Sequence, residues 1–216
     1  MAAQAALSFV QNGMAVGLGT GTTSAIFIQL LAKMAKEKGW KIRGVATSVA
    51  SGQLARSLGI DVISLEEAKN IDLAVDGADQ IDGHNNLVKG YGGALAREKI
   101  VEYSAKKFVV IADDSKLCKF LCKPIPVEFI PFAKATVQCS LIALGAKSAS
   151  LRLNPDGEPY RTDNGLWIFD ADFKQIKNPA SLEEKIKKIP GVLESGIFSK
   201  NISDVIVGTD DGMKKL

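Results

Sequence analysis

The residue of this chain best suited to moving a proton is Glu98, in the segment KGYGGALAREKIV at residues 89–101. On a helix, its neighbours three and four positions away are three apolar residues and one acid: Ala94, Leu95, Val101 and Glu102. A half-desolvated carboxylate near a second acid holds a proton more readily than one in water, as a general base requires. The competing interpretation is a surface glutamate in an exposed salt bridge, and Glu98 taken alone favours it.

A lysine and a glycine-rich turn, Lys89, Gly90, Tyr91 and Gly92, stand directly before that helix. Backbone N–H groups of such a turn can approach a ligand, and the helix N-terminus adds the positive end of its dipole. The segment therefore suits an anion, or an oxygen on which negative charge develops.

The segment GLGTGTTS, residues 17–24, leads from a predicted strand into a predicted helix and suits a phosphate or a polyol. Thr20, Thr22 and Thr23 supply hydroxyl groups, and Gly21 lets the backbone approach an anion. A dinucleotide fingerprint, G-x-G-x-x-G, fails because position 22 is threonine and because VATS ends the next strand without the expected acid. Glycine-rich turns of this kind are also often purely structural.

The segment VDGADQID, residues 75–82, carries three carboxylates at intervals of three: Asp76, Asp79 and Asp82. Asp76 ends a buried strand, where a carboxylate needs hydrogen-bond partners, and sugar hydroxyls would supply them. A metal site is one alternative, but the spacing differs from a calcium loop, whose ligands alternate. Turn chemistry is another, and it explains Asp82 well. We expect the chain's one histidine, His84, to be a surface turn residue.

A fourth polar segment, IADDSK at residues 111–116, follows another apolar run. Asp114 or Ser115 could cap a helical turn. Lys116 could equally face the crevice and meet a phosphate as a compact charge.

Strands and helices alternate in the first part of the chain. Short apolar runs predict strands buried on both faces, at 14–19, 42–47, 71–76 and 108–113. Helical patterns lie between them, at 22–37, 49–58 and 92–105. This alternation predicts an α/β fold with a doubly wound, mostly parallel, Rossmann-like sheet. Ligands of such sheets bind outside the carboxyl ends of the strands, where the polar segments fall.

The rhythm changes after Pro124. Strands are expected at 126–130, 150–153, 166–170 and 192–198, and helices at 132–145 and 181–189. Ser181 and Glu184 form a predicted capping box. The order β-α-β-β-α-β is that of a ferredoxin-like α+β unit. A last apolar strand, 204–209, is expected to rejoin the first sheet. We therefore expect a catalytic domain at 1–124 and 203–216 and an inserted domain at 125–202.

The composition is that of a globular protein: 46% of the 216 residues are hydrophobic and 24% are charged, with a net charge of +3. The densest basic patches lie on or beside predicted amphipathic helices, so no nucleic-acid partner is expected. Three cysteines fit reduced thiols. The first residues lack the features of a secretory signal, and no apolar run approaches the ~20 residues that cross a bilayer. A cytoplasmic protein without a membrane partner is expected.

Together, the polar segments resemble those of type A ribose-5-phosphate isomerases. GTGTT, VDGADQID, KGYGGALAREK and IADDSK occur in that family's order and spacing, and weaker matches include IPVEFIP, TDNG, IPGV, GIF and GTDDG. The resemblance covers nearly the whole chain.

The resemblance implies interconversion of D-ribose 5-phosphate and D-ribulose 5-phosphate without a metal or cofactor, in a homodimer or homotetramer. It implies that Glu98 transfers the proton. Contacts to the sugar phosphate would come from the three loops and one lysine: Thr20, Gly21, Thr22 and Thr23; Asp76, Gly77, Ala78 and Asp79; Lys89, Gly90, Tyr91 and Gly92; and Lys116. Asp76, Asp79 and Lys89 would assist Glu98 in catalysis.

The chain departs from the family pattern at three places. Tyr91 replaces the usual glycine, Gln80 replaces a common glutamate, and the lysines that many relatives carry near the first helix are missing. If one of those lysines helps to hold phosphate, affinity is lower here. Two other kinds of protein remain as alternatives: a non-catalytic sugar-phosphate sensor, and a related enzyme such as an amino-sugar phosphate deaminase or a CoA transferase.

Overall fold

The computed structural model describes residues 1–209 and 212–216, which pack into two compact units. The first unit consists of Met1–Ala78, Arg97–Lys116 and Lys200–Leu216, and the second of Asp79–Ala96 and Leu117–Ser199. The expected inserted domain, 125–202, stays a prediction. Two residues of the GTDDG motif, Asp210 and Asp211, lie outside the described residues.

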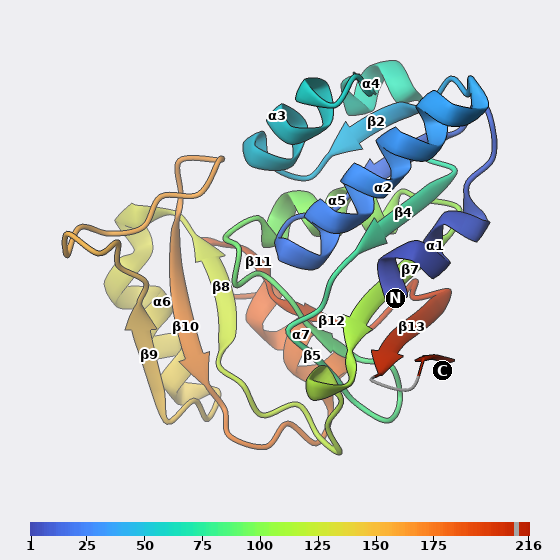
Figure 1. Ribbon diagram of the computed structural model, residues 1–216. Helices are drawn as coiled ribbons and strands as arrows, with labels where there is room; N and C mark the ends of the chain where they lie inside the picture. The colour runs from blue at the N-terminus through green and yellow to red at the C-terminus, as the bar shows by residue number, and fades with distance from the viewer. Residues whose placement is uncertain (210–211) are drawn as a thin grey trace. The chain divides into compact units, whose positions relative to one another are not determined.

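A seven-stranded sheet forms the centre of the first unit (Figure 1). Its strands are β1 (Ala15–Leu18), β2 (Arg43–Ala46), β3 (Asp61–Val62), β4 (Leu73–Asp76), β7 (Phe108–Asp113), β13 (Asp204–Thr209) and β14 (Gly212–Lys215). Their order is β14-β13-β7-β4-β1-β2-β3, and only the β13–β14 pair is antiparallel. The mostly parallel sheet and the return of the strand at 204–209 are therefore confirmed.

The order of the strands reverses between β1 and β4. From β1 the chain proceeds outward through β2 and β3, whereas from β4 it proceeds outward the other way through β7 and β13. At such a switch point the loops after the two central strands diverge and leave a crevice. The loops after β1 and β4 are GTGTT and the segment that begins at Asp76.

Helices cover both faces of this sheet. The helices are α1 (Ala2–Ala6), α2 (Thr22–Lys38), α3 (Val49–Ser57), α4 (Leu65–Ala68) and α5 (Leu95–Tyr103), with short 3-10 helices at Leu7–Phe9 and Asp114–Lys116. On one face, the larger core includes Val16, Phe27 of α2 and Ala55 of α3, all fully buried. On the other face, Ala15 packs with Val101 of α5. Alternate residues of β1 thus serve opposite layers, which explains why its sequence is apolar throughout.

The second unit contains a four-stranded antiparallel sheet with the strands β8 (Ile125–Phe129), β9 (Ser148–Leu151), β10 (Trp167–Asp172) and β11 (Val192–Ser195). Two helices, α6 (Lys134–Ala143) and α7 (Pro179–Lys187), pack on one face of it, and a 3-10 turn, Pro131–Ala133, precedes α6. The sheet order β11-β8-β10-β9 and the chain order β-α-β-β-α-β are those of a ferredoxin-like unit, as predicted.

Two details of the sequence-based expectation are wrong. The predicted strand 192–198 is interrupted at Gly196, and its end, β12 (Ile197–Phe198), pairs with β6 (Leu87–Val88) in a separate three-stranded sheet that also contains β5 (Gln80–Ile81). A Cβ at Gly196 would overlap the Lys89 carbonyl oxygen, so this close approach of two backbones needs glycine.

The predicted capping box at Ser181 is the second error. Helix α7 begins at Pro179, and Asn178 caps it by accepting a hydrogen bond from the Ser181 backbone N–H at 3.1 Å. Asparagine followed by proline is itself a strong helix start, because proline at the first position loses no hydrogen bond. Among the described residues, no helix is both long and apolar enough to cross a membrane.

Candidate active site

The loop after β1 is held in place by the strand end of β4. Thr20 N donates to Asp76 Oδ1 at 3.0 Å, and the Thr20 hydroxyl lies 2.7 Å from Thr47 Oγ1 and donates to Ser48 Oγ at 2.8 Å. Gly21 then adopts φ +106°, in the region that favours glycine, and α2 begins at Thr22. The predicted phosphate loop is thus a rigid turn tied to three parallel strand ends.

Asp76 is the centre of this arrangement, with 1% of its surface exposed. Besides Thr20 N, its Oδ1 accepts hydrogen bonds from Ser24 Oγ and from Gly77 N, both at 2.6 Å. Protein donors, rather than the sugar hydroxyls we expected, therefore occupy this oxygen. We call Thr20, Ser24, Asp76 and Gly77 the Asp76 cradle.

A cavity of about 370 Å³ borders the same loop within the first unit. It is lined by residues 19–22 of the loop, by α2 and by α3: Gly19, Thr20, Gly21, Thr22, Ala25, Ile28, Ala50, Ser51 and Leu54. The glycine-rich loop thus borders open space on one side while its other side is bound by the Asp76 cradle.

Glu98 lies on α5 with only 3% of its surface exposed. Its helix neighbours Leu95, Val101 and Glu102 are also buried, the last at 1%. The interpretation as an exposed surface glutamate is therefore wrong, and the carboxylate occupies the apolar helix face that its spacing predicted. The helix begins at Leu95, three residues later than expected, which leaves the glycine turn outside it.

Lys116 ends the 3-10 turn that follows β7 and is half-buried. Asp113, not Asp114 or Ser115, caps that turn: it accepts hydrogen bonds from Ser115 N at 3.0 Å and from the Ser115 hydroxyl. The hydroxyl bond in particular lowers the pKa of the Asp113 carboxyl, against a smaller effect of burial.

In the second unit, Asp79 and the glycine turn meet. Asp79 Oδ2 accepts a hydrogen bond from Tyr91 N at 3.2 Å, and the Asp79 carbonyl accepts one from Lys123 Nζ at 3.0 Å. The Tyr91 hydroxyl donates to the Pro124 carbonyl at 3.0 Å. Burial, followed by the nearby carboxylates of Asp170 and Asp79, raises the pKa of Tyr91 to about 12.

Lys89 is buried at 2% exposure, and its Nζ lies 5.5 Å from the centre of the Phe198 ring. Its backbone N–H donates to the Gly196 carbonyl at 2.9 Å. The turn that follows closes with a hydrogen bond from Gly93 N to the Gly90 carbonyl at 3.0 Å. These two hydrogen bonds fix the backbone of residues 89–93, which carries Lys89 and the N–H groups of the turn.

Asp82, the last acid of the segment VDGADQID, is a turn residue, as predicted. Asp82 Oδ1 accepts hydrogen bonds from His84 N and Asn86 N, each at 2.9 Å, and His84 is exposed. Gln80 holds the segment Cys122–Lys123 by accepting from both backbone nitrogens at 2.8 Å. An amide also donates, here to Cys122 Sγ, which the glutamate of the family pattern would not do when ionised.

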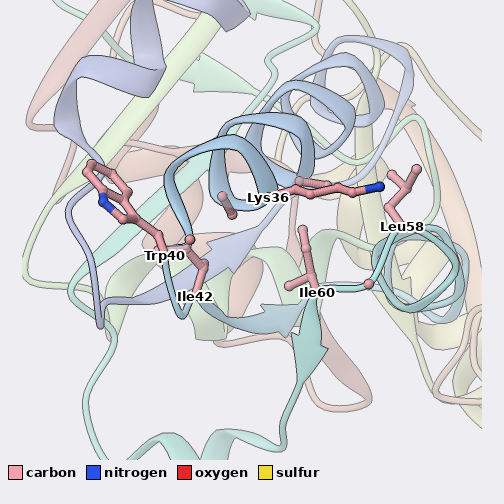
Figure 2. Close-up of a pocket in the computed structure, with 9 residues that line it drawn as sticks. Lys36, Trp40, Ile42, Leu58 and Ile60 are labelled. Carbon is pink, nitrogen blue, oxygen red and sulfur yellow. The ribbon is translucent and has the colours of Figure 1, made fainter.

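Another cavity, of about 430 Å³, lies at the opposite ends of the parallel strands (Figure 2). It is lined where β2 and β3 begin and where α2 and α3 end: Ala32, Ala35, Lys36, Gly39, Trp40, Ile42, Leu58, Gly59 and Ile60. Figure 2 shows the Lys36 stem extending toward Leu58. None of the predicted site residues lines it, and ligands of parallel sheets bind at the other end.

Sequence reasoning missed Arg152, which binds the glycine turn. Its Nη1 donates to the Gly90 carbonyl at 2.9 Å. The available signal was a charged residue between Leu151 and Leu153 at the end of a predicted strand, because a half-buried arginine needs partners.

Comparison with known proteins places the chain among sugar-phosphate isomerases. The family model of ribose 5-phosphate isomerase A (phosphoriboisomerase A) matches residues 43–212. The ribose-5-phosphate isomerase A of Pyrococcus horikoshii is 46% identical over 221 residues, covering 100% of this chain and 96% of the relative.

Two solved structures agree over the whole chain. Ribose 5-phosphate isomerase A from Methanocaldococcus jannaschii gives a TM-score of 0.95 at 42% identity, covering 100% of this chain and 96% of that one. A D-ribose-5-phosphate isomerase in complex with phospho-erythronic acid gives a TM-score of 0.96 at 44% identity, covering 100% and 95%.

Proposed function

Because the chain belongs to the ribose 5-phosphate isomerase A family, we propose that it interconverts D-ribose 5-phosphate and D-ribulose 5-phosphate through an enediolate. The observation that supports this most directly is the burial of Glu98, at 3% exposure, on the helix that follows the glycine turn. A desolvated carboxylate is the group that a proton transfer between two carbons requires.

In this proposal, Glu98 takes the proton from C2 of the open-chain aldose. The C2–H electron pair becomes the C1=C2 bond, and the aldehyde oxygen O1 takes the charge. Glu98 then returns the proton to C1 while the hydroxyl proton of O2 passes to O1, which leaves the ketone at C2. Atoms and charge balance without a redox partner.

Lys89 and the N–H groups of the glycine turn stabilise the charge on the enediolate oxygen. Such donors commonly contribute roughly 3–4 kcal/mol to the transition state. Asp79 orients hydroxyls of the substrate and assists ring opening, together with Asp76.

Thr20 to Thr23 and Lys116 hold the phosphate at the far end of the sugar. The backbone of the loop and the dipole of α2 suit an anion. Binding energy from this remote group fixes the reacting carbons near the base.

We further propose that the active form is a cytoplasmic homodimer or homotetramer, with residues 1–124 and 203–216 as the catalytic domain and 125–202 as the insertion. The mass of the active enzyme in size-exclusion chromatography tests the oligomer, and a monomeric active enzyme would contradict it. Expression of residues 125–202 alone tests the domain division, and an unfolded fragment would contradict it.

The activity is tested by following ribose 5-phosphate in D₂O by NMR. Loss of the C2 proton and the appearance of a ketose support the isomerase. A bound but unchanged sugar supports a sensor instead. Activity is expected to survive excess EDTA, and a loss that added metal restores would contradict a metal-free mechanism.

A further inference from the structure

In the second unit, one arginine holds two successive carbonyl groups of the turn that follows Lys89. Arg152 Nη1 lies 2.9 Å from the Gly90 oxygen and 3.3 Å from the Tyr91 oxygen. On its other edge, Nε lies 3.0 Å from Asp170 Oδ2, and Nη2 lies 2.5 Å from Asp170 Oδ1. The two-point contact with the carboxylate fixes the plane of the guanidinium and so aims its remaining N–H at the turn.

The peptide between Gly90 and Tyr91 is bound from both sides. In a planar trans peptide, the C=O and N–H groups point in opposite directions. Arg152 binds the carbonyl oxygen of this peptide, while Asp79 Oδ2 accepts its N–H, the Tyr91 nitrogen, at 3.2 Å. Rotating the peptide would break both charged hydrogen bonds.

The next peptide has the same orientation. Its carbonyl, that of Tyr91, also faces Arg152, so the Gly92 N–H points away from the guanidinium, as the Tyr91 N–H does. Because Asp79 already accepts the Tyr91 N–H, the Gly92 N–H is the member of this pair that can meet an anionic oxygen.

The alternation of the antiparallel sheet explains why Arg152 can reach the turn. Ala149 of β9 and Ala171 of β10 belong to the core beneath α6 and α7, so Asp170 and Arg152 lie on the opposite face. There the rings of Tyr91 and Tyr160 lie 5.8 and 5.9 Å from the guanidinium carbon, a distance at which aromatic rings attract a cation.

We propose that Arg152 is a positioning residue. By holding the carbonyls of Gly90 and Tyr91, it aims the Gly92 N–H at the oxygen on which charge develops during isomerisation, while Asp79 holds the Tyr91 N–H. This inference rests on the proposed function. Arg152 acts through the turn and does not contact the substrate.

Arg152→Gln tests the inference. Because losing one donor to an oxyanion costs roughly 10²–10³-fold in kcat, a turn that adopts the right geometry only part of the time should lose about 10-fold, with KM changed less than about 3-fold. Arg161→Gln is the matched control, since Arg161 is exposed in the same unit. It should keep wild-type kinetics, and equal losses in both variants would contradict the inference.

Two inhibitors distinguish a positioning role of Arg152 from a merely structural one. The carboxylate of phospho-erythronic acid stands in for the enediolate oxygens, whereas inorganic phosphate reports only the phosphate loop. In Arg152→Gln, the inhibition constant of the first should rise by about the factor by which kcat/KM falls. That of phosphate should not change. A parallel rise of both constants would show a merely structural role and overturn the inference.

Arg152→Lys serves if the glutamine variant does not fold, because lysine keeps the charge and the stem but offers no fork for Asp170. The same pattern of inhibition with a smaller factor is expected, and wild-type behaviour overturns the inference. If the wild-type protein itself does not isomerise ribose 5-phosphate, the proposed function fails; if it does and both Arg152 variants match it, only the role of Arg152 fails.

Discussion

The Asp76 cradle and the glycine turn of residues 90–93 are fixed by different means. Each presents backbone N–H groups beside a carboxylate: Thr20 N meets Asp76, and Tyr91 N meets Asp79. The cradle joins the ends of adjacent parallel strands, so the sheet itself places its members. The turn is held by Arg152, which lies 61 positions from Tyr91 along the chain.

The two loops are therefore positioned in two ways, one by the topology of the sheet and the other by side chains. Parallel strands end together, so a loop at a switch point gains its partners from the topology of the fold. A turn outside such a sheet needs side chains from elsewhere, and half-buried charged groups with several partners supply the required stiffness. We therefore expect a change in the backbone of the cradle to affect folding and activity together, and loss of Arg152 from the turn to affect mainly activity.

Gly19→Ala should have the largest effect on the cradle. A Cβ at Gly19 would overlap Asp76 Oδ1, so the loop must move. We expect the free energy of unfolding to fall by about 1–3 kcal/mol, and kcat/KM to fall about 100-fold. Urea unfolding and a coupled assay measure these. Gly83→Ala is the control, since a Cβ there meets open space. A Gly19→Ala protein with wild-type unfolding free energy and kcat/KM would contradict the role given to the cradle.

Asp76→Asn should have an intermediate effect and separates the shape of the cradle from its charge. The amide oxygen can still accept from Thr20 N, Ser24 Oγ and Gly77 N, so stability should change by less than about 1 kcal/mol. The missing carboxylate should lower kcat about 10-fold, since it can no longer accept a proton during ring opening. Asp61→Asn, at an exposed position, is the control. Unchanged kcat would restrict Asp76 to a structural role.

Tyr91→Phe should have the smallest effect, on the turn. It removes the hydrogen bond to the Pro124 carbonyl, so the unfolding free energy should fall by about 0.5–1.5 kcal/mol, with kcat within about 3-fold. A larger loss of turnover than of stability would give the hydroxyl a role at the substrate.

The pH dependence of stability sharpens this test. The pKa of Tyr91 is raised to about 12 in the folded protein, so its stabilising effect is complete below the unfolded value near 10. It is lost as pH rises from about 10 toward 12, so wild-type stability should fall more steeply there than that of Tyr91→Phe. If the stability of the two proteins falls equally between pH 10 and 12, the raised pKa of Tyr91 is contradicted.

The same difference decides what the sequence can predict. The largely apolar run at 14–19 is followed by Thr20, and the run at 71–76 ends in Asp76, so the parallel sheet and the neighbourhood of Thr20 and Asp76 follow from pattern alone. Helix spacing places Glu98 on a largely apolar helix face, although Glu98 taken alone favoured an exposed salt bridge. These local signals reach only a few residues along the chain.

The partners of the turn could not be predicted in this way. That Arg152 binds the Gly90 carbonyl depends on the pairing register of β9 and β10, which no local pattern specifies. The break at Gly196 depends likewise on the approach of Lys89, from another part of the chain. The start of α7 is set locally, by Asn178 as the cap and Pro179 at the first helical position, and not by the Ser181–Glu184 spacing from which it was predicted.

The most direct test of the account is the turnover of Glu98→Gln. Glutamine keeps the shape of the buried side chain but cannot accept the C2 proton, so kcat should fall at least ~100-fold. Inhibition by inorganic phosphate should be kept, and Glu37→Gln, at an exposed helix position, should behave as wild type. Near-normal conversion of ribose 5-phosphate by Glu98→Gln would contradict the assignment of Glu98 as the base.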